Sequence, residues 1–211
     1  MLAADDRHHL ERVLRLRRGA VVTVADGIGG WRACTLGAAG VLDPTGAVQH
    51  VPMAAPVITI AFAVTKGERP ELVVQKLTEL GIDRISPFHA RRSVARWEGE
   101  RAVRHVERLR RVAREASAQS RRAWLPVVTE LVDLAELLGT PGTALADPGG
   151  DPPSLAAPTV VIGPEGGFAP EEQALAGRTV ALGPLTLRAE TAAIAVGALL
   201  TGLRADLVVE R

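Results

Sequence analysis

Two glycine-rich turns near the carboxyl end of the chain carry the residue types best suited to binding a ligand. The first turn is Gly163-Pro164-Glu165-Gly166-Gly167, and the second begins at Gly183-Pro184. The last two glycines of the first turn lack a Cβ atom and tolerate positive φ, so backbone N–H groups there can closely approach a bound molecule. Three side chains that could act on a substrate follow the second turn: Arg188, Glu190 and Thr191.

A single Gly-Pro turn is more often an ordinary connection between a strand and a helix. Two such turns in tandem, followed by charged and hydroxyl side chains, favour a ligand pocket. The chain has no G-x-x-x-x-G-K-[ST] motif and no G-x-G-x-x-G after a strand, so the turns do not indicate a triphosphate or dinucleotide site. We therefore predict a largely neutral or cationic ligand held by backbone amides and carbonyls.

Apolar runs and helical segments alternate around these turns, which is the pattern of an α/β fold. The β-branched run Thr159–Ile162 enters the first turn, a helix is expected over Pro170–Ala176, and the run Thr179–Leu182 enters the second turn. Ligands of open α/β sheets bind at the carboxyl ends of strands, where such loops gather. We expect the two turns to lie side by side.

The segments IGPEGGF (Ile162–Phe168) and LGPLTLRAETA (Leu182–Ala192) resemble the paired signature of the SPOUT superfamily of S-adenosylmethionine-dependent RNA methyltransferases. They are most similar to the RsmE-type family, which methylates N3 of one uridine in 16S ribosomal RNA. The resemblance implies a SPOUT α/β domain with a C-terminal trefoil knot, S-adenosyl-L-methionine as cofactor, and a homodimer packed across the site. It also implies 16S rRNA or the small ribosomal subunit as partner.

The resemblance also assigns site residues. Backbone around the two turns would hold the cofactor, at Ile162, Gly163, Glu165, Gly166, Gly167, Leu182, Gly183, Leu187 and Thr191. Arg188 would hold the nucleotide phosphate or a uracil O4 oxygen, and Glu190 would orient Arg188; the alternative for both is an ion pair at a helix start.

A third segment, ASAQSRRAWLP, resembles the family's E-Q-S-x-R-x-x-x-P stretch. It makes Arg122 our candidate for a phosphate or base contact near the reacting uridine. Ala118 stands at the glutamate position, so a catalytic role for that carboxylate does not carry over.

Residues 1–56 indicate a small β-rich module, and residues 57–211 the methyltransferase domain. Strands are expected at Ala20–Ala25 and Trp31–Leu36, joined by the turn dipeptide Asp26-Gly27. The pattern HHLERVLRLRRGAVVTVADG resembles the family's N-terminal PUA-like RNA-binding β-barrel. Family members usually carry an additional strand before the first helix, His8–Leu16 here, and Met1–Asp6 is too short to supply it.

Seven residues at positions that match the family are candidate RNA contacts: His9, Arg12, Arg15, Lys66, Arg69, Arg91 and Arg92. For the first three, a solvated helix face is an equally good explanation. Lys66 and Arg69 precede a helix expected over Glu71–Leu80, within KGERPELVVQKLTELG. We interpret Gln75, Lys76 and Glu79 as polar partners that fix this helix against the sheet.

Two further helices are expected. The helix from about Glu98 to Ser120 has one buried apolar stripe and a basic stripe, Arg101, Arg104, Arg108 and Arg111. The basic stripe is either a phosphate-binding surface or a solvated face paired to glutamates. The last helix, from Glu190 to about Leu203, is apolar around nearly its whole circumference, which predicts burial at a dimer interface. Asp147–Pro158 is expected to be a flexible surface loop.

Composition excludes several classes. Cys34 is the single cysteine, which rules out an intramolecular disulfide and fits a reducing cytoplasm. We find no signal-peptide pattern, no apolar run long enough for a bilayer, and no Cys/His spacing typical of a metal site, so we expect neither membrane nor metal partners. The net charge of +1 does not by itself indicate nucleic acid, and 3% aromatic residues argue against stacking of several bases.

The functional hypothesis is transfer of a methyl group to uracil N3. The N3 atom must lose its proton, and the base must be unpaired or flipped because N3 is paired in a duplex. The alternatives are another SPOUT RNA methyltransferase, acting on tRNA or another rRNA site, and a non-catalytic RNA-binding protein that kept the fold. The sequence identifies no general base.

Overall fold

The computed structural model describes residues 15–209, and the chain divides into two compact units. The N-terminal unit comprises the chain up to Met53 together with Arg122–Trp124. The C-terminal unit comprises Ala54–Arg121 and Leu125–Arg211. Two of the candidate RNA contacts, His9 and Arg12, lie outside the described residues.

The N-terminal unit contains a four-stranded antiparallel sheet. Its strands are β1 (Val21–Ala25), β2 (Gly30–Leu36), β3 (Leu42–Pro44) and β4 (Gln49–His50), with the short 3-10 helix η2 (Ala38–Gly40) between β2 and β3. At the β1–β2 turn, Asp26 Oδ1 accepts the N–H groups of Ile28 at 2.8 Å and Gly30 at 2.9 Å. The two predicted strands are confirmed, and closure into a barrel stays a prediction.

A short downstream segment completes this unit. The Trp124 indole donates a hydrogen bond to the Val51 carbonyl at 2.8 Å, and the Gly29 N–H donates one to the Ala123 carbonyl at 3.0 Å. Gly29 has φ +100°, and a Cβ atom there would lie 2.8 Å from the Trp124 ring. Trp124 is therefore a packed aromatic side chain of the N-terminal unit.

The C-terminal unit is built on a six-stranded sheet in the order β10-β8-β9-β5-β6-β7, and every pairing in it is parallel. The strands are β5 (Thr59–Ala63), β6 (Arg84–Phe88), β7 (Val127–Val128), β8 (Thr143–Asp151), β9 (Thr159–Ile162) and β10 (Thr179–Val180). All five residues of β5 are buried, as expected for a strand covered on both faces. The predicted α/β class is confirmed.

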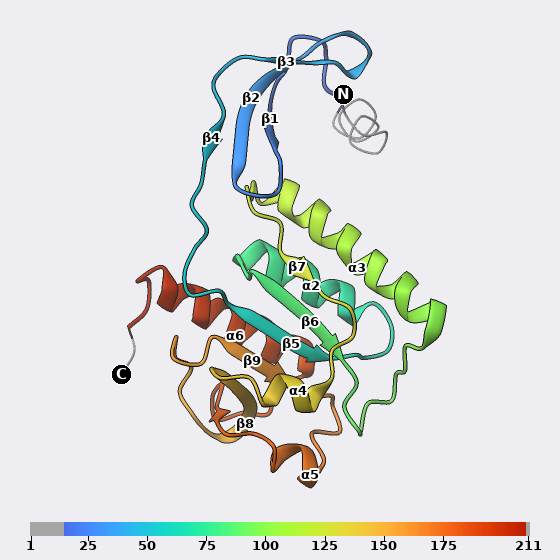
Figure 1. Cartoon of the computed structure of the whole chain (residues 1–211), viewed down its shortest axis with the longest axis vertical. Helices are drawn as coiled ribbons and strands as arrows, with labels where there is room; N and C mark the ends of the chain where they lie inside the picture. Colours follow the sequence, from blue (N-terminus) through green and yellow to red (C-terminus); the bar gives the residue numbers. More distant parts are fainter. Residues whose placement is uncertain (1–14, 210–211) are drawn as a thin grey trace. The chain divides into compact units, whose positions relative to one another are not determined.

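Helices cover both faces of this sheet (Figure 1). The long helices α2 (Arg69–Leu80), α3 (Gly99–Gln119) and α6 (Ala189–Arg204) cover one face, and α4 (Leu134–Leu138) covers the other. Side chains of β5 alternate accordingly: Ile60 and Phe62 join the core under the long helices, and Ala61 and Ala63 join the smaller core under α4. The short helix α5 (Pro170–Gln173) follows the first glycine turn.

The predicted loop Asp147–Pro158 is partly wrong, because β8 continues to Asp151. Asp151 lies opposite Val180 of β10, and its carbonyl accepts the Ala181 N–H at 2.8 Å. A Cβ atom at Gly150 would overlap the Val180 backbone, so glycine lets the two strands approach here. Gly150, one of the two glycines that suggested a loop in the sequence, is therefore a close-approach position in the sheet.

The last helix, α6, packs on the sheet and on α2 with one side only. Gly197 lies against α2 so closely that a Cβ atom there would be 2.8 Å from Leu77 Cδ2. Leu199, on the opposite side, is 37% exposed, and Ala198 is also exposed. The single chain thus leaves one side of α6 exposed, and burial of that side at a dimer interface stays a prediction.

Within residues 15–209, no helix is both long and apolar enough to cross a membrane. The same residues contain no group of three or more His, Cys, Asp or Glu side chains that could hold a metal ion.

Candidate functional site

The two glycine turns line one cavity of about 200 Å³ in the C-terminal unit. The cavity lies where β9 and β10 end and is lined along the turns by Ile162, Gly163, Pro164, Glu165, Gly167, Leu182, Gly183, Leu185, Thr186 and Leu187. The expectation that the turns lie side by side is confirmed. Sequence reasoning missed Asp147 and Pro148, which also line the cavity because β8 continues past the point where a loop was expected.

The glycines of this cavity meet two separate physical requirements. Gly167 has φ +67° and Gly183 has φ +131°, which are conformations that L side chains rarely adopt. At Gly163 the constraint is space, because a Cβ atom would lie 2.7 Å from Phe168 Cε2. The Phe168 ring is 6% exposed and stacks on Phe88 with 6.4 Å between ring centroids, so it has little freedom to move.

The lining chemistry suits a ligand without negative charge. Among the described residues that line the cavity, the charged side chains are Asp147 and Glu165, and none is Lys or Arg. Apolar side chains make up most of the rest, including Ile162, Leu182 and Leu187. The arrangement matches the predicted site for a neutral or cationic ligand.

Four predicted residues of this region do not line the cavity: Gly166, Arg188, Glu190 and Thr191. The Gly166 carbonyl instead accepts a hydrogen bond from Arg92 Nη1 at 3.2 Å. Thr191 is exposed on the first turn of α6. Arg188 is exposed at the N-cap of α6 and makes no ion pair with any residue in the described part of the chain.

Arg69 lies between two carboxylates, one within the first turn and one after the second. Its Nη1 donates to Glu165 Oε1, and its Nε lies 3.8 Å from Glu190 Oε1. The Glu190 side chain is 14% exposed, and its Oε2 atom is buried without a hydrogen-bond partner. The sequence suggested that Glu190 orients Arg188, but in the structure Glu190 pairs with Arg69. We call Arg69, Glu165 and Glu190 the Arg69 cluster.

Two more candidate RNA contacts also bind carboxylates or carbonyls of the first turn and α5. The Arg91 N–H donates to Glu172 Oε1 at 2.7 Å, and its guanidinium pairs with Glu171. Arg92 holds the Gly166 carbonyl, as described above. Lys66 differs from both, because it is exposed and no hydrogen bond or ion pair joins it to another described residue. Arg15 is exposed in the N-terminal unit, without regular secondary structure.

Next to this region, His89 follows the end of β6. Its Nε2 accepts the Trp97 N–H at 3.0 Å, which requires the neutral ring. Burial is the main cause that lowers the His89 pKa from its usual 6.5, and the nearby charge of Arg96 lowers it further. The segment after β6 is therefore held by an uncharged histidine.

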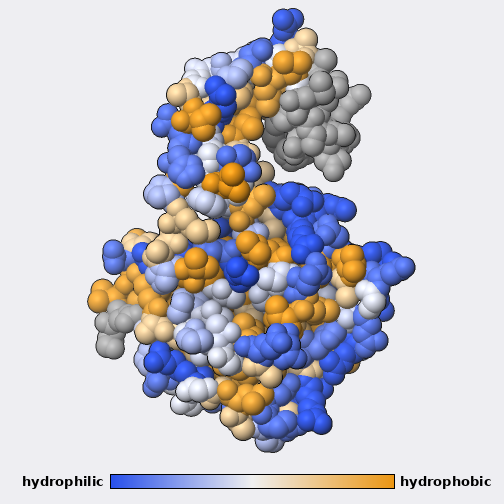
Figure 2. Space-filling model, viewed as in Figure 1, coloured by the Kyte–Doolittle hydropathy of each residue, from blue (hydrophilic) through white to orange (hydrophobic). Residues whose placement is uncertain are grey.

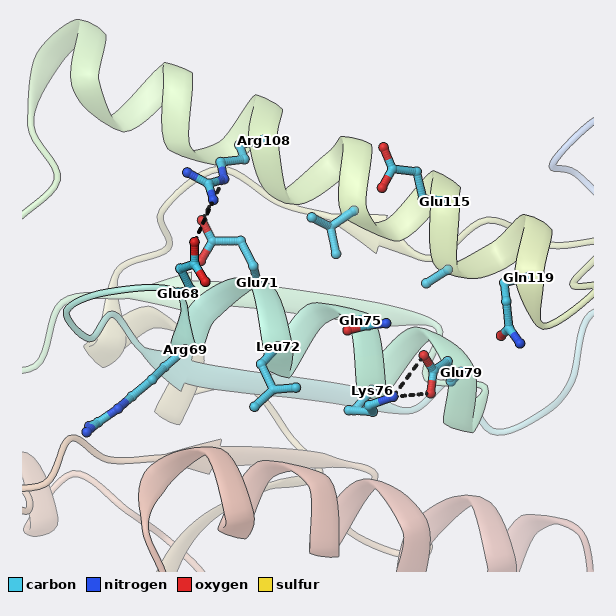
Figure 3. Close-up of a pocket in the computed structure, with 12 residues that line it drawn as sticks. Glu68, Arg69, Glu71, Leu72, Gln75, Lys76, Glu79, Arg108, Glu115 and Gln119 are labelled. Atoms are coloured by element: carbon cyan, nitrogen blue, oxygen red, sulfur yellow. Dashed lines mark hydrogen bonds and ion pairs between the residues drawn. The ribbon is translucent and has the colours of Figure 1, made fainter. Parts of the chain in front are cut away.

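A second hollow lies between α2 and α3 and has a volume of about 1040 Å³. Figure 3 shows Gln75 and Glu79 on α2, with Glu115 and Gln119 on α3, around this groove. Lys76 Nζ donates to both Glu79 oxygens, at 2.8 and 3.1 Å. The interpretation of Gln75, Lys76 and Glu79 as partners of the sheet is wrong, because Val73, Val74 and Leu77 form the buried face of α2.

The basic stripe of α3 is exposed at all four arginines, and Figure 2 shows a mainly hydrophilic surface over this helix. Arg104 Nη1 lies 3.4 Å from Glu100 Oε2, and Arg108 Nε lies 2.9 Å from Glu71 Oε1. Part of the stripe is thus neutralised by glutamates, as the second of the two sequence interpretations states. Arg122 lies just beyond this helix, is half-buried, and belongs to the N-terminal unit.

Comparison with known proteins agrees with this architecture. The family profile described as RNA methyltransferase domain matches residues 53–201, and the profile described as RNA methyltransferase PUA domain matches residues 2–40. Ribosomal RNA small subunit methyltransferase E of Mycobacterium bovis is 34% identical over 217 residues, covering 92% of this chain and 83% of that protein. The Bacillus subtilis protein of the same name is 28% identical, covering 90% and 85%.

Solved structures show the same fold. A Legionella pneumophila protein described as a methyltransferase, solved with bound S-adenosylmethionine, superposes with a TM-score of 0.84 at 26% identity, covering 95% of this chain and 90% of that one. Ribosomal RNA small subunit methyltransferase E of Neisseria gonorrhoeae has the same fold, with a TM-score of 0.82 at 24% identity, covering 96% and 90%. The RNA methyltransferase profile covers 71% of the chain, and the named relatives align with at least 90% of it. The chain therefore belongs to the ribosomal RNA small subunit methyltransferase E family.

Proposed function

We propose that this protein transfers a methyl group from S-adenosyl-L-methionine to N3 of a uridine in the 16S rRNA of the small ribosomal subunit. The observation that carries the proposal is the single cavity in which both glycine turns meet. Relatives named ribosomal RNA small subunit methyltransferase E align with most of the chain, and the Legionella neighbour holds the same cofactor in a similar fold.

The residues around the cavity fit this cofactor chemically. Its sulfonium is a cation, which suits a lining whose charged side chains are the carboxylates Asp147 and Glu165. Its adenine suits the apolar side chains of Leu182 and Leu187, with backbone groups of the turns as hydrogen-bond partners. We assign cofactor binding to the predicted residues that line the cavity: Ile162, Gly163, Glu165, Gly167, Leu182, Gly183 and Leu187. When bound, the sulfonium supplies an electrophilic methyl group, so the protein needs no covalent nucleophile.

The protein's own contribution is to place the uracil and to stabilise the charge that develops on it. Transfer would require N3 to lose its proton, which water would accept, and the donor would leave as neutral S-adenosylhomocysteine. Negative charge spreads onto O4 of the base, and a guanidinium there would stabilise it. We assign this role to Arg188, whose guanidinium is available at the start of α6, and a phosphate or base contact to Arg122. Glu190 pairs with Arg69 in the first turn of α6, so we give it no direct contact with Arg188.

Substrate binding is proposed to use both parts of the chain. Residues 1–56 would act as a PUA-like RNA-binding domain through His9, Arg12 and Arg15, and residues 57–211 as the methyltransferase domain with its C-terminal knot. Lys66 would contact an RNA phosphate. The exposed apolar side chains of Ala198 and Leu199 on α6 support a homodimer through this helix. We place the reaction in the cytoplasm, where ribosomal subunits are present.

The test is methylation of small subunits and of naked 16S rRNA that lack the modification, with the product mapped by mass spectrometry. We expect 3-methyluridine at one position, and at least about a hundredfold slower turnover in Arg122→Ala and Arg188→Ala. Methylation of tRNA or of another rRNA atom would replace this proposal by the other SPOUT activity. Binding of RNA without any methyl transfer would indicate a non-catalytic protein.

A further inference from the structure

We infer that Arg69 is a positioning residue of the cofactor cavity and not an RNA contact. This inference rests on the proposed function, because it concerns the cavity assigned to S-adenosylmethionine. In the Arg69 cluster, one guanidinium holds Glu165 of the first turn and approaches Glu190 of α6. Arg69 therefore links the first glycine turn and the start of α6 to the start of α2.

The two carboxylates of the Arg69 cluster belong to the two segments that form the cavity. Glu165 lines the cavity, and Glu190 lies in the first turn of α6, directly after the second glycine turn. Arg69 is the first residue of α2, which packs against α6 and the sheet. A displacement of either carboxylate would therefore move one glycine turn of the cavity relative to the other turn.

Burial makes Glu190 dependent on this guanidinium. The Glu190 side chain is 14% exposed, and its Oε2 atom has no hydrogen-bond partner. A carboxylate in this environment needs a nearby positive charge, and removal of that charge leaves it buried and uncompensated. The Arg69–Glu165 pair alone would contribute little, because those side chains are 43% and 47% exposed. The main effect of losing Arg69 is thus a shifted first turn of α6.

Arg69 and Lys66, which is three residues earlier in the chain, differ in their ion-pair partners. The Arg69 guanidinium already faces two carboxylates, which a phosphate would have to displace. Lys66 is exposed and has no such partner among the described residues. An RNA phosphate would therefore bind Lys66 in preference to Arg69.

The experiment measures S-adenosylmethionine binding by calorimetry and 16S rRNA binding at several salt concentrations, both on the full chain. We expect Arg69→Gln to raise the Kd for S-adenosylmethionine about tenfold and to change the RNA Kd less than about twofold. Lys66→Ala should raise the Kd for 16S rRNA and leave the Kd for S-adenosylmethionine unchanged. The matched control is Arg110→Gln: Arg110 also binds two glutamates, Glu107 at 2.7 Å and Glu130 at 2.8 Å, but lines neither cavity nor groove.

A second variant identifies the cause. If Arg69 acts by compensating buried Glu190, then Glu190→Gln in the Arg69→Gln background should restore part of the affinity for S-adenosylmethionine and part of the lost thermal stability. This double variant also serves if Arg69→Gln alone does not fold. An Arg69→Gln variant with unchanged cofactor affinity and weakened RNA binding would overturn the inference and leave the proposed function standing. Absence of cofactor binding by the unmodified chain would overturn both.

Discussion

Replacing Gly163 by alanine tests the packing on which the cavity depends. The added Cβ atom would lie 2.7 Å from Phe168 Cε2, and 3.0 and 3.1 Å from two more ring atoms. Carbon atoms in comfortable contact are about 3.5–4.0 Å apart, so the ring or the turn must move by about 1 Å. Phe168 is 6% exposed and stacks on the fully buried Phe88, which leaves the ring nowhere to go without disturbing the smaller core.

Overpacking of this kind costs about 1–3 kcal/mol in the free energy of unfolding. We expect Gly163→Ala to lower that free energy by such an amount in urea titrations. Because Gly163 and Phe168 both line the cavity, we also expect weaker S-adenosylmethionine binding by calorimetry. Gly177→Ala is the matched control, since a Cβ atom there has no neighbour within 4 Å and its φ is not positive. It should be neutral or stabilise by about 0.4–1 kcal/mol.

A double-mutant cycle assigns the cost to the ring. In a Phe168→Leu background the clashing ring atoms are gone, so adding Gly163→Ala should cost less than about 0.5 kcal/mol. If the cost of Gly163→Ala is the same in both backgrounds, the ring is not its source. If Gly163→Ala matches Gly177→Ala in stability and in cofactor affinity, our account of the first turn is refuted.

Three other predictions concern the rest of the C-terminal unit. Lys66→Ala should weaken RNA binding and reduce the slope of log K against log salt by about 1, without changing cofactor affinity, as filter binding will show. The His89 pKa is lowered in the folded protein, so the unfolded chain binds more protons as the pH drops through 6.5. The free energy of unfolding should therefore decrease over this range. In urea titrations from pH 7.5 to 5, His89→Gln should make this decrease smaller. Leu199→Glu should convert the proposed dimer to monomers in analytical ultracentrifugation, because it places charge in an apolar interface; an unchanged mass would exclude this face of α6.

Elements with a clear hydrophobic period were predictable from the sequence. The helix expected over Glu98–Ser120 is α3 at Gly99–Gln119, and the strand expected at Thr159–Ile162 has those bounds in the structure. Both could be predicted because the spacing of apolar residues within each segment indicates its secondary structure and its buried face. The helix expected to end at Leu80 does so in α2, and Gly81, with φ +92°, is its C-cap.

The extension of β8 and the partners of the arginines were not predictable in this way. Asp147–Asp151 is rich in Pro and Gly, and only the pairing of Asp151 with Val180 makes its second half a strand. Arg69 and Glu165 are 96 residues apart, and Arg91 and Glu171 are 80 apart. Nothing local in the sequence distinguishes an arginine with such a partner from one that faces solvent.

This difference changes how basic residues near the cavity should be interpreted. In the sequence, Lys66, Arg69, Arg91 and Arg92 form one set of candidate phosphate contacts. In the structure the three arginines are engaged by the first turn, α5 or α6, and Lys66 alone of the four has no partner among the described residues. An internal carboxylate competes with a phosphate for the guanidinium of Arg69 or Arg91, whereas the partner of Arg92 is the Gly166 carbonyl. Among these four residues we therefore expect Lys66 to be the best placed to contact an RNA phosphate.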